Sequence, residues 1–343
     1  MSEIHVSVII PCYNVDNYIE EGICSILNQT YTNFEVVCID DCSTDNTYKI
    51  LLNFSKIDSR VKVYKNLKNI GLVGTLNKLV EFATSDILIR MDPDDISVNY
   101  RIEKLVNTYI QTKSLVISSR YRLINKTGKH IPYKGYDILS SPNGIKFTSL
   151  FNSPIPHAPA LIHKSIFSKF KYDKQYLAAE DYNLWVNLIL SNFNDFVILK
   201  DVLYLYRIID TSTSFINNSV QAKNHILISK KAINGILGLN YENLNVMYTK
   251  NTYERNIYTY ELFQKSINEL KEIKNLFIKK IKPTEIEIIE IKKYNNQHSV
   301  FLSYRFLKSM NFIEKIKSIK IILLNLNIYI SFSSLKFLLK RIV

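Results

Sequence analysis

The 343-residue chain is predicted to be an α/β protein in which a mostly parallel sheet is flanked by helices. Two observations lead to this prediction. Short apolar runs rich in β-branched residues alternate with longer stretches of helical periodicity. Clusters of polar residues, many of them aspartates, follow the apolar runs. Because open α/β sheets bind ligands beyond the carboxyl ends of their strands, the same order predicts where a binding site lies.

The expected strands and helices alternate along the first 91 residues. Apolar runs predict strands at Val6–Pro11, Phe34–Asp40, Val61–Lys65 and Ile87–Met91. Helical periodicity predicts helices at Asn17–Asn28, Thr44–Phe54 and Leu72–Phe82. This order predicts buried parallel strands joined by right-handed crossovers.

A turn with three carboxylates follows the fourth strand. Asp92 and Asp94 flank Pro93, whose fixed φ angle stiffens the turn. Mg²⁺ and Mn²⁺ take oxygen ligands of this kind and share them with substrate phosphates. The turn therefore predicts a divalent-cation site, although an isolated D-x-D sequence is often only an acidic surface turn.

A second polar cluster follows the strand that ends at Asp40. Asp41 can accept a hydrogen bond from a base or a ribose hydroxyl, and Ser43 or Thr44 is expected to cap the next helix. Capping alone explains residues 43–45 but leaves Asp40 and Asp41 without a reason, so both interpretations stay open. The chain has no Walker A or G-x-G-x-x-G sequence, which argues against P-loop and dinucleotide-binding enzymes.

The charge is concentrated in the second part of the chain. Residues 1–214 carry a net charge of +1 and residues 215–343 a net charge of +12. Cationic amphipathic helices such as those expected at Lys271–Lys282 and Phe312–Arg341 can lie on anionic lipid, or they can form a helical subdomain packed on the rest. Ile319–Leu339 is interrupted by Lys and Asn too often for a membrane span. Nucleic-acid binding is not expected, since no recognised motif supports it.

The N-terminal residues and the cysteines predict where the protein works. The opening apolar run is short and lacks a basic segment before it, so we expect a cytoplasmic protein, with the basic C-terminal region placing it on the inner face of the membrane. The four cysteines match neither a zinc pattern nor a secreted disulfide framework, so reduced thiols are expected.

Taken in order, the motifs resemble those of the inverting, GT-A-fold glycosyltransferases of family 2. The resemblance rests on VSVIIPCYN, IDDCSTDNT, Asn69-Ile70-Gly71 followed by Leu76-Asn77, MDPDD, and Ala179-Glu180-Asp181-Tyr182 with Trp185. It implies a GT-A catalytic domain over residues 1–214, with a nucleotide-sugar half at 1–100 and an acceptor half at 101–214. A basic, helical C-terminal region at 215–343 follows.

A closer resemblance is to bacterial lipooligosaccharide β-1,3-N-acetylhexosaminyl and galactosyl transferases. It rests on the segments FNSPIPH at 151–157 and LYR at 205–207. It implies transfer of a hexose or N-acetylhexosamine from a UDP-sugar to a lipooligosaccharide or a capsular or surface polysaccharide, through a β bond and by this resemblance a β-1,3 bond. Ile209 departs from the pattern, because those enzymes commonly have a His at this position.

The resemblance also implies roles for individual residues. Asp92 matches the ribose contact and Asp94 the metal-binding acid, with Asp92 beside it, for Mn²⁺ or Mg²⁺. Asp181 is implied as the general base and Glu180 is its rival. The residues implied to bind the nucleotide sugar are Pro11, Tyr13, Asn14, Asp41, Asn69, Gly71, Asp92 and Arg207, the last as a diphosphate contact.

Two residues are assigned to the acceptor or donor pocket with alternatives open. His157 lies in a proline-rich loop where a structural role is equally expected. Trp185 could stack on a sugar, but its helical spacing from Asp181 also fits the core. Two other functions are considered for the whole chain: a non-catalytic scaffold that binds nucleotide sugars, and a metal-dependent nucleotidyltransferase, whose glycine- and arginine-rich phosphate loop is absent.

Overall fold

The computed structural model describes residues 4–132, 137–209, 218–243 and 259–309, and the chain divides into two compact units. The first unit comprises residues 1–134 and 153–217, and the second comprises residues 135–152 and 218–343. Residues 135–152, expected in the acceptor half, therefore belong with the C-terminal helices.

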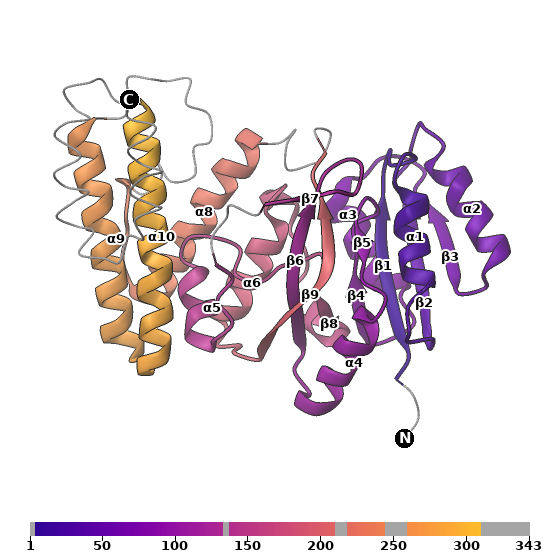
Figure 1. The fold of residues 1–343 in the computed structure, drawn as a ribbon, viewed down its shortest axis with the longest axis horizontal. Helices are drawn as coiled ribbons and strands as arrows, with labels where there is room; N and C mark the ends of the chain where they lie inside the picture. The colour runs from indigo at the N-terminus through magenta and orange to yellow at the C-terminus, as the bar shows by residue number, and fades with distance from the viewer. Residues whose placement is uncertain (1–3, 133–136, 210–217, 244–258, 310–343) are drawn as a thin grey trace. The chain divides into compact units, whose positions relative to one another are not determined.

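The first half of the first unit has the expected alternation of strands and helices (Figure 1). Its elements are β1 (Val6–Cys12), α1 (Ile19–Leu27), β2 (Phe34–Asp40), α2 (Thr47–Ile57), β3 (Val61–Lys65), α3 (Gly71–Phe82) and β4 (Ile87–Arg90). The remaining elements are β5 (Ile96–Ser97), α4 (Arg101–Thr112), β6 (Val116–Ile124), β7 (His130–Ile131), β8 (Leu161–His163), η1 (Lys164–Ser168), η2 (Lys174–Tyr176), α6 (Glu180–Leu190) and β9 (Phe196–Arg207).

One mixed sheet of nine strands runs through the described part of this unit. Its strand order is β3-β2-β1-β4-β8-β6-β9-β5, with β7 added to β6. The pairs β1–β2, β1–β4 and β2–β3 are parallel, as expected. The pair β6–β9 is also parallel, whereas β8 is antiparallel to both β4 and β6. The carboxyl ends of β1, β2 and β4 therefore lie at one edge, which gathers their polar clusters.

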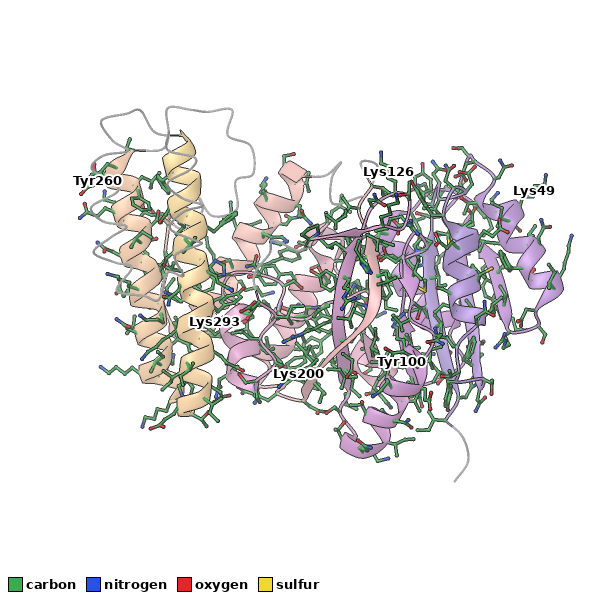
Figure 2. The ribbon with its side chains drawn as sticks, viewed as in Figure 1. Lys49, Tyr100, Lys126, Lys200, Tyr260 and Lys293 are labelled. Carbon is green, nitrogen blue, oxygen red and sulfur yellow. The ribbon has the colours of Figure 1, made fainter. Side chains whose placement is uncertain are left out.

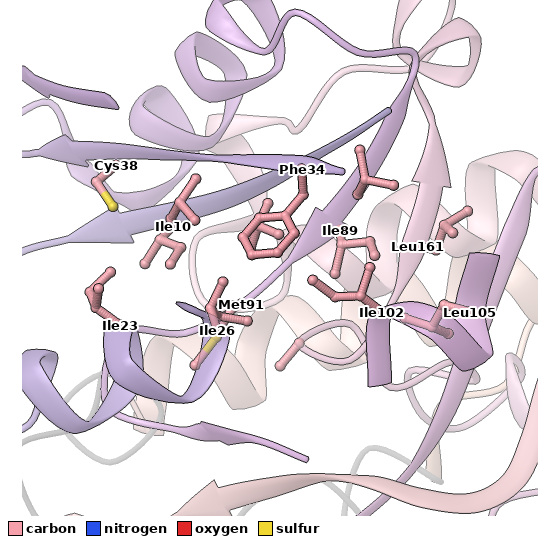
Figure 3. Packing of buried hydrophobic residues seen from close by; sticks show 14 of the residues in the cluster. Ile10, Ile23, Ile26, Phe34, Cys38, Ile89, Met91, Ile102, Leu105 and Leu161 are labelled. Atoms are coloured by element: carbon pink, nitrogen blue, oxygen red, sulfur yellow. The ribbon is translucent and has the colours of Figure 1, made fainter. Parts of the chain in front are cut away.

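Alternate residues of the central strands form the core beneath α1. Ile10 of β1 packs with Ile23 and Ile26 of α1, and Met91 lies in the same cluster (Figure 3). All four side chains are at most 1% exposed. Burying each contributes about 1.5–3 kcal/mol, so the helix is held firmly against the strand ends that carry the polar clusters.

Helix α1 also touches the carboxylate turn directly. A Cβ atom placed on Gly22 would lie 2.6 Å from the carbonyl oxygen of Pro93, too close for any side chain. The glycine therefore allows the backbone of the turn to rest on the helix.

The second unit is helical. It contains α5 (Pro142–Thr148), α8 (Asn218–Leu237), α9 (Tyr260–Ile281) and α10 (Glu285–Ser309). Phe147 of α5 meets Phe277 of α9 and Tyr294 of α10 at ring-centroid distances of 5.1 Å and 6.2 Å. These aromatic contacts explain why residues 135–152 leave the sheet unit, a grouping that local periodicity does not reveal.

Helices of the described ranges are too short or too polar to cross a membrane. The segments Phe312–Arg341 and Ile319–Leu339, for which the sequence predicts an amphipathic helix and excludes a span, lie outside those ranges.

Replacing Gly22 with alanine is expected to displace the turn at residues 92–95. Overpacking of this kind costs about 1–3 kcal/mol, which lowers the melting temperature of a unit this size by about 2–4 °C per kcal/mol. Thermal unfolding and amide exchange of the turn measure the effect. Glu20→Ala, at an exposed position of the same helix, is the matched control. An unchanged exchange rate at residues 92–95 in the Gly22 variant would contradict the expectation.

Candidate active site

The turn after β4 presents a carboxylate, Asp94, for which no ion pair appears among the described residues. Asp92 forms an ion pair with Arg90, and its backbone N–H donates to the Tyr204 hydroxyl at 2.9 Å. Asp94 is half-buried, and within the described ranges no side chain donates to its carboxylate. Burial, with the charge of Asp92 added, raises the pKa of Asp94 to about 6. Such a carboxylate is poised for a cation.

A second pair of carboxylates lies at the start of α6. Ser153 donates to Asp181 at 3.0 Å, which fixes the orientation of that side chain. Glu180 is buried, and its Oε2 atom has no hydrogen-bond partner among the described residues. Burial and then the charge of Asp181 raise the pKa of Glu180 to about 7, and burial also raises the pKa of Asp181. A carboxylate with a pKa near 7, such as Glu180, is suited to exchange a proton near neutral pH.

Arg90, at the end of β4, brings the two carboxylate groups into one electrostatic site. Burial lowers the pKa of Arg90, but the charge of Asp92 raises it above its ordinary value, so the guanidinium stays ionised. That positive charge in turn lowers the pKa values of Asp94, Glu180 and Asp181 against the effect of burial. The turn and the start of α6 therefore face one buried cation.

Asp41 holds the loop that carries Asn69 and Gly71. Its carboxylate accepts from the Asn66 amide at 2.8 Å and from the backbone N–H groups of Ile70 and Gly71 at 2.9 Å and 2.8 Å. Asn69 itself accepts from the Gly71 N–H at 3.0 Å. The predicted nucleotide residues of this region thus form one connected loop.

The residues after β1 and β2 brace each other rather than capping a helix. Thr44 donates its backbone N–H to the Asn14 side chain at 2.9 Å, and Ser43 accepts from the Asn14 N–H at 3.0 Å. Helix α2 begins after Asn46 and has no side-chain cap, so the expected capping by Ser43 or Thr44 is wrong. The pairing partner lay 30 residues away in the chain, where local capping rules do not reach.

Pro11 and Tyr13 occupy different environments at the end of β1. Pro11 is buried in the sheet opposite Ile39, whereas the Tyr13 ring is 48% exposed. Tyr13 is therefore available to a ligand at this edge as a side chain, and Pro11 only through its backbone.

His157 and Trp185 pack together in the interior. His157 shares a hydrogen bond of 2.8 Å with the Tyr172 hydroxyl and meets the Trp185 ring edge-on at 5.8 Å. Burial, with the charge of Arg90, lowers the pKa of His157 well below its ordinary value, so the ring is neutral. Trp185 is fully buried and has no ring face to offer a sugar in this structure.

Arg207 lies beneath the carboxylate turn. Its guanidinium is buried, and it donates to the Asp94 carbonyl at 2.7 Å and to Glu21. Ile209, the departure from the lipooligosaccharide pattern, is also buried, at 6% exposed.

Two residues that sequence reasoning did not single out are central to the site. Arg90 gave one signal, a lone charge at the end of an otherwise apolar run. Tyr204 gave none, because its hydroxyl meets Asp92 across 112 residues of sequence.

The donor set fits a divalent cation that is shared with a substrate. No group of three or more His, Cys, Asp or Glu side chains among the described residues forms a closed metal site. Mg²⁺ and similar cations often use only one or two protein carboxylates and complete their coordination with phosphates and water. Asp94, unneutralised and half-buried, with Asp92 beside it, matches that arrangement.

The sequence and its relatives identify the family. The sequence model of the family described as "Glycosyl transferase family 2" matches residues 7–177. The O-antigen biosynthesis glycosyltransferase WbnJ of Escherichia coli is 32% identical over 214 residues, which cover 61% of this chain and 81% of that protein. The chain belongs to glycosyl transferase family 2. This confirms the glycosyltransferase prediction at the level of the family.

Two further similarities bear on this family 2 glycosyltransferase. One is to the E. coli UDP-Glc:α-D-GlcNAc-diphosphoundecaprenol β-1,3-glucosyltransferase WfgD, 28% identical over 218 residues, or 62% of this chain and 81% of that protein. The other is to S. aureus TarS 1-349, solved with UDP-GlcNAc, at 20% identity and a TM-score of 0.58 over 88% of this chain and 92% of that one. The second similarity confirms the GT-A fold.

Replacing Asp94 with asparagine is expected to stabilise the fold at neutral pH. The folded-state pKa of about 6 lies above the ordinary carboxyl value, so ionised Asp94 destabilises the fold at pH 7, and this cost disappears as the pH falls through 6 toward 4. The melting temperature should rise by about 2–4 °C at pH 7.5 and match the wild type near pH 4. Asp86→Asn, at an exposed position before β4, is the control. A lower melting temperature at pH 7.5 would contradict the burial argument.

The two carboxylates of α6 are expected to determine how kcat/KM falls as the pH is lowered. Wild-type kcat/KM should rise with pH through the region of the Glu180 pKa, about 7. Glu180→Gln removes a negative neighbour, so the rise should move to lower pH while activity at high pH is retained. Rate measurements from pH 5 to 9 test this. Loss of activity in the Glu180 variant at every pH would instead identify Glu180 as the base.

Proposed function

We propose that this glycosyltransferase moves a hexose or N-acetylhexosamine from a UDP-sugar to a lipooligosaccharide or a capsular or surface polysaccharide, with inversion to a β bond. One observation carries the proposal. The unneutralised carboxylate of the turn and the proton-accepting pair of α6 act on the same buried Arg90. This shared partner supports placing the donor diphosphate and the base in one site.

The donor site proposed here runs along the carboxyl ends of β1, β2 and β4. Tyr13 offers an exposed ring, Asn14 and Asn69 lie on the neighbouring loops, and Asp92 is the candidate ribose contact. Asp41 contributes by holding the loop of Asn69 and Gly71. The TarS structure with UDP-GlcNAc supports a UDP-sugar as the class of donor.

Asp94, with Asp92 beside it, would hold Mn²⁺ or Mg²⁺ at this site. When bound, the cation neutralises the negative charge that grows on the departing diphosphate. The protein residues around it supply the support, since Arg90 fixes Asp92 and the Tyr204 hydroxyl accepts from the Asp92 N–H.

Asp181 is proposed as the general base. Ser153 orients the carboxylate by a hydrogen bond of 3.0 Å, and the carboxylate would accept the proton of the acceptor hydroxyl. The acceptor oxygen then attacks the anomeric carbon as the bond to the diphosphate breaks. Direct displacement from the opposite face converts an α donor linkage into a β product.

The name of the E. coli relative WfgD supports the acceptor class and the linkage. That protein is named for a lipid-linked acceptor and a β-1,3 bond. We extend both to this chain as the proposal, a glycan acceptor attached to lipid and a β-1,3 linkage. The scaffold alternative is not favoured, because the carboxylates that chemistry requires are all present.

Replacing Asp181 with asparagine is expected to lower kcat by at least about 10²–10⁴, the usual contribution of a general base. Donor binding should stay unchanged, because the side chain keeps its shape. Turnover of a panel of UDP-sugars with a lipid-linked glycan acceptor, with and without Mn²⁺, measures the effect and names the donor. Ser153→Ala, which leaves the carboxylate unoriented, should cost less. Normal turnover by the Asp181 variant would remove it as the base.

The second unit is proposed to place the enzyme on an anionic membrane surface. Several side chains around the turn between α9 and α10 are exposed, and we call them the α9–α10 surface. They are Lys279, Lys280, Lys282, Ile286, Ile289, Lys292 and Lys293. Ile286 and Ile289 are 72% and 67% exposed. Glu272 and Glu285 are the exposed acids among residues 270–293, and Lys293 (Figure 2) pairs with Asp137. Basic side chains around exposed isoleucines fit anionic headgroups over an acyl layer.

Sedimentation with lipid vesicles tests the α9–α10 surface. The full-length protein is expected to bind vesicles containing phosphatidylglycerol, weakly at high salt and weakly to pure phosphatidylcholine. Replacing Ile286 and Ile289 with asparagine should reduce binding several-fold, since each removes buried apolar area. Ile57→Asn, at an 82% exposed isoleucine of α2, is the matched control. Equal binding by the double variant and the wild type would contradict the proposal.

A further inference from the structure

Residues at the end of β9 hydrogen-bond the carboxylate turn at three of its positions, 92, 94 and 95. The Tyr204 hydroxyl accepts from the Asp92 N–H, and the Arg207 N–H donates to the Asp95 carboxylate at 2.7 Å. Between these points, the Arg207 Nε atom donates to the Asp94 carbonyl at 2.7 Å. The backbone on either side of the candidate metal ligand is therefore tied to one strand.

The guanidinium of Arg207 is fully committed to protein groups. Besides the Asp94 carbonyl, it donates from Nη1 to the Lys126 carbonyl at 3.1 Å and from Nη2 to Glu21. The Tyr18 ring covers one face at 5.1 Å, and the residue is 3% exposed. All three nitrogen atoms thus have protein acceptors, which leaves the group poorly placed to bind a diphosphate.

We propose that Arg207 is a positioning residue that fixes the Asp94 carboxylate for the divalent cation, and that it is not a diphosphate ligand. The inference rests on the proposed metal-dependent function. A planar guanidinium can hold the Asp94 carbonyl, the Lys126 carbonyl and Glu21 at once, because its N–H groups point along fixed directions. A lysine ammonium at the same place has one nitrogen and cannot reach all three acceptors.

Helix α1 supports the same turn from the other side. Glu21 accepts a hydrogen bond from Arg207 Nη2. The adjacent Gly22 lets the Pro93 carbonyl approach the helix closely. The turn is thus fixed between α1 and β9. Outer partners of this kind orient metal ligands, and their loss typically lowers metal affinity by about 10–100-fold.

Calorimetry on the full-length protein separates positioning from direct diphosphate binding. Mn²⁺ is titrated into protein saturated with UDP, and UDP is titrated separately in the presence of chelator. For Arg207→Lys we expect about tenfold weaker Mn²⁺ binding and UDP binding without metal within about twofold of wild type. An equal loss of metal-free UDP affinity would overturn the inference in favour of a diphosphate ligand, and unchanged Mn²⁺ affinity would also overturn it.

Two further variants keep the test decisive if Arg207→Lys does not fold. Tyr204→Phe removes the acceptor of the Asp92 N–H, and Glu21→Gln weakens the Arg207 ion pair, so each should weaken Mn²⁺ binding several-fold. Arg60→Lys is the matched control. Arg60 bonds Asp58 and the Leu27 carbonyl, at the opposite ends of the strands, and its replacement should leave Mn²⁺ affinity unchanged. Wild-type protein that binds no Mn²⁺ with UDP would instead refute the proposed function itself.

Discussion

The buried positive charge of Arg90 is the constraint on which the site depends. Two carboxylates of the turn and two of α6 lie close enough to feel its charge. Like charges 4 Å apart at a protein surface repel by about 4 kcal/mol, so carboxylates gathered without a cation would take up protons instead. Burial raises the pKa values of Asp94, Glu180 and Asp181, and the charge of Arg90 opposes that rise. The proposed function uses these acids both to hold a cation and to accept a proton.

Such a set of buried charges destabilises the fold. Hydrogen bonds from the surrounding residues hold the charged segments in place. Asp92 is tied to Tyr204, Asp94 to Arg207, and Asp181 to Ser153. The first two contacts hold the backbone of the turn, and the third holds the Asp181 carboxylate. The apolar packing of α1 on β1 and Met91 provides the rigid base. The free-energy cost of burying charge thus falls on a few side chains, and hydrogen bonds and apolar packing hold the segments that carry them.

The sequence predicted the part of the fold that local patterns determine. The first four strands and three helices appear at the expected places because their apolar spacing is a local property. Expectations that depend on distant partners fared differently. Ser43 and Thr44 bond Asn14 instead of capping α2, and residues 135–152 join the C-terminal helices through Phe147. The roles of Arg90 and Tyr204 arise from contacts that no sequence window contains.

The end of β9 contributes structure to the site rather than charge. Arg207 is bonded on all three nitrogens, and Ile209, which follows the strand, has a buried apolar side chain. Arg207, the cation at the carboxyl end of β9, therefore donates to protein groups from each of its nitrogens. In the proposed function, neutralising a diphosphate would therefore fall to the cation at Asp94. A turn fixed from two sides matters in the proposed function, because few carboxylates, Asp94 and Asp92, would carry the affinity for the cation.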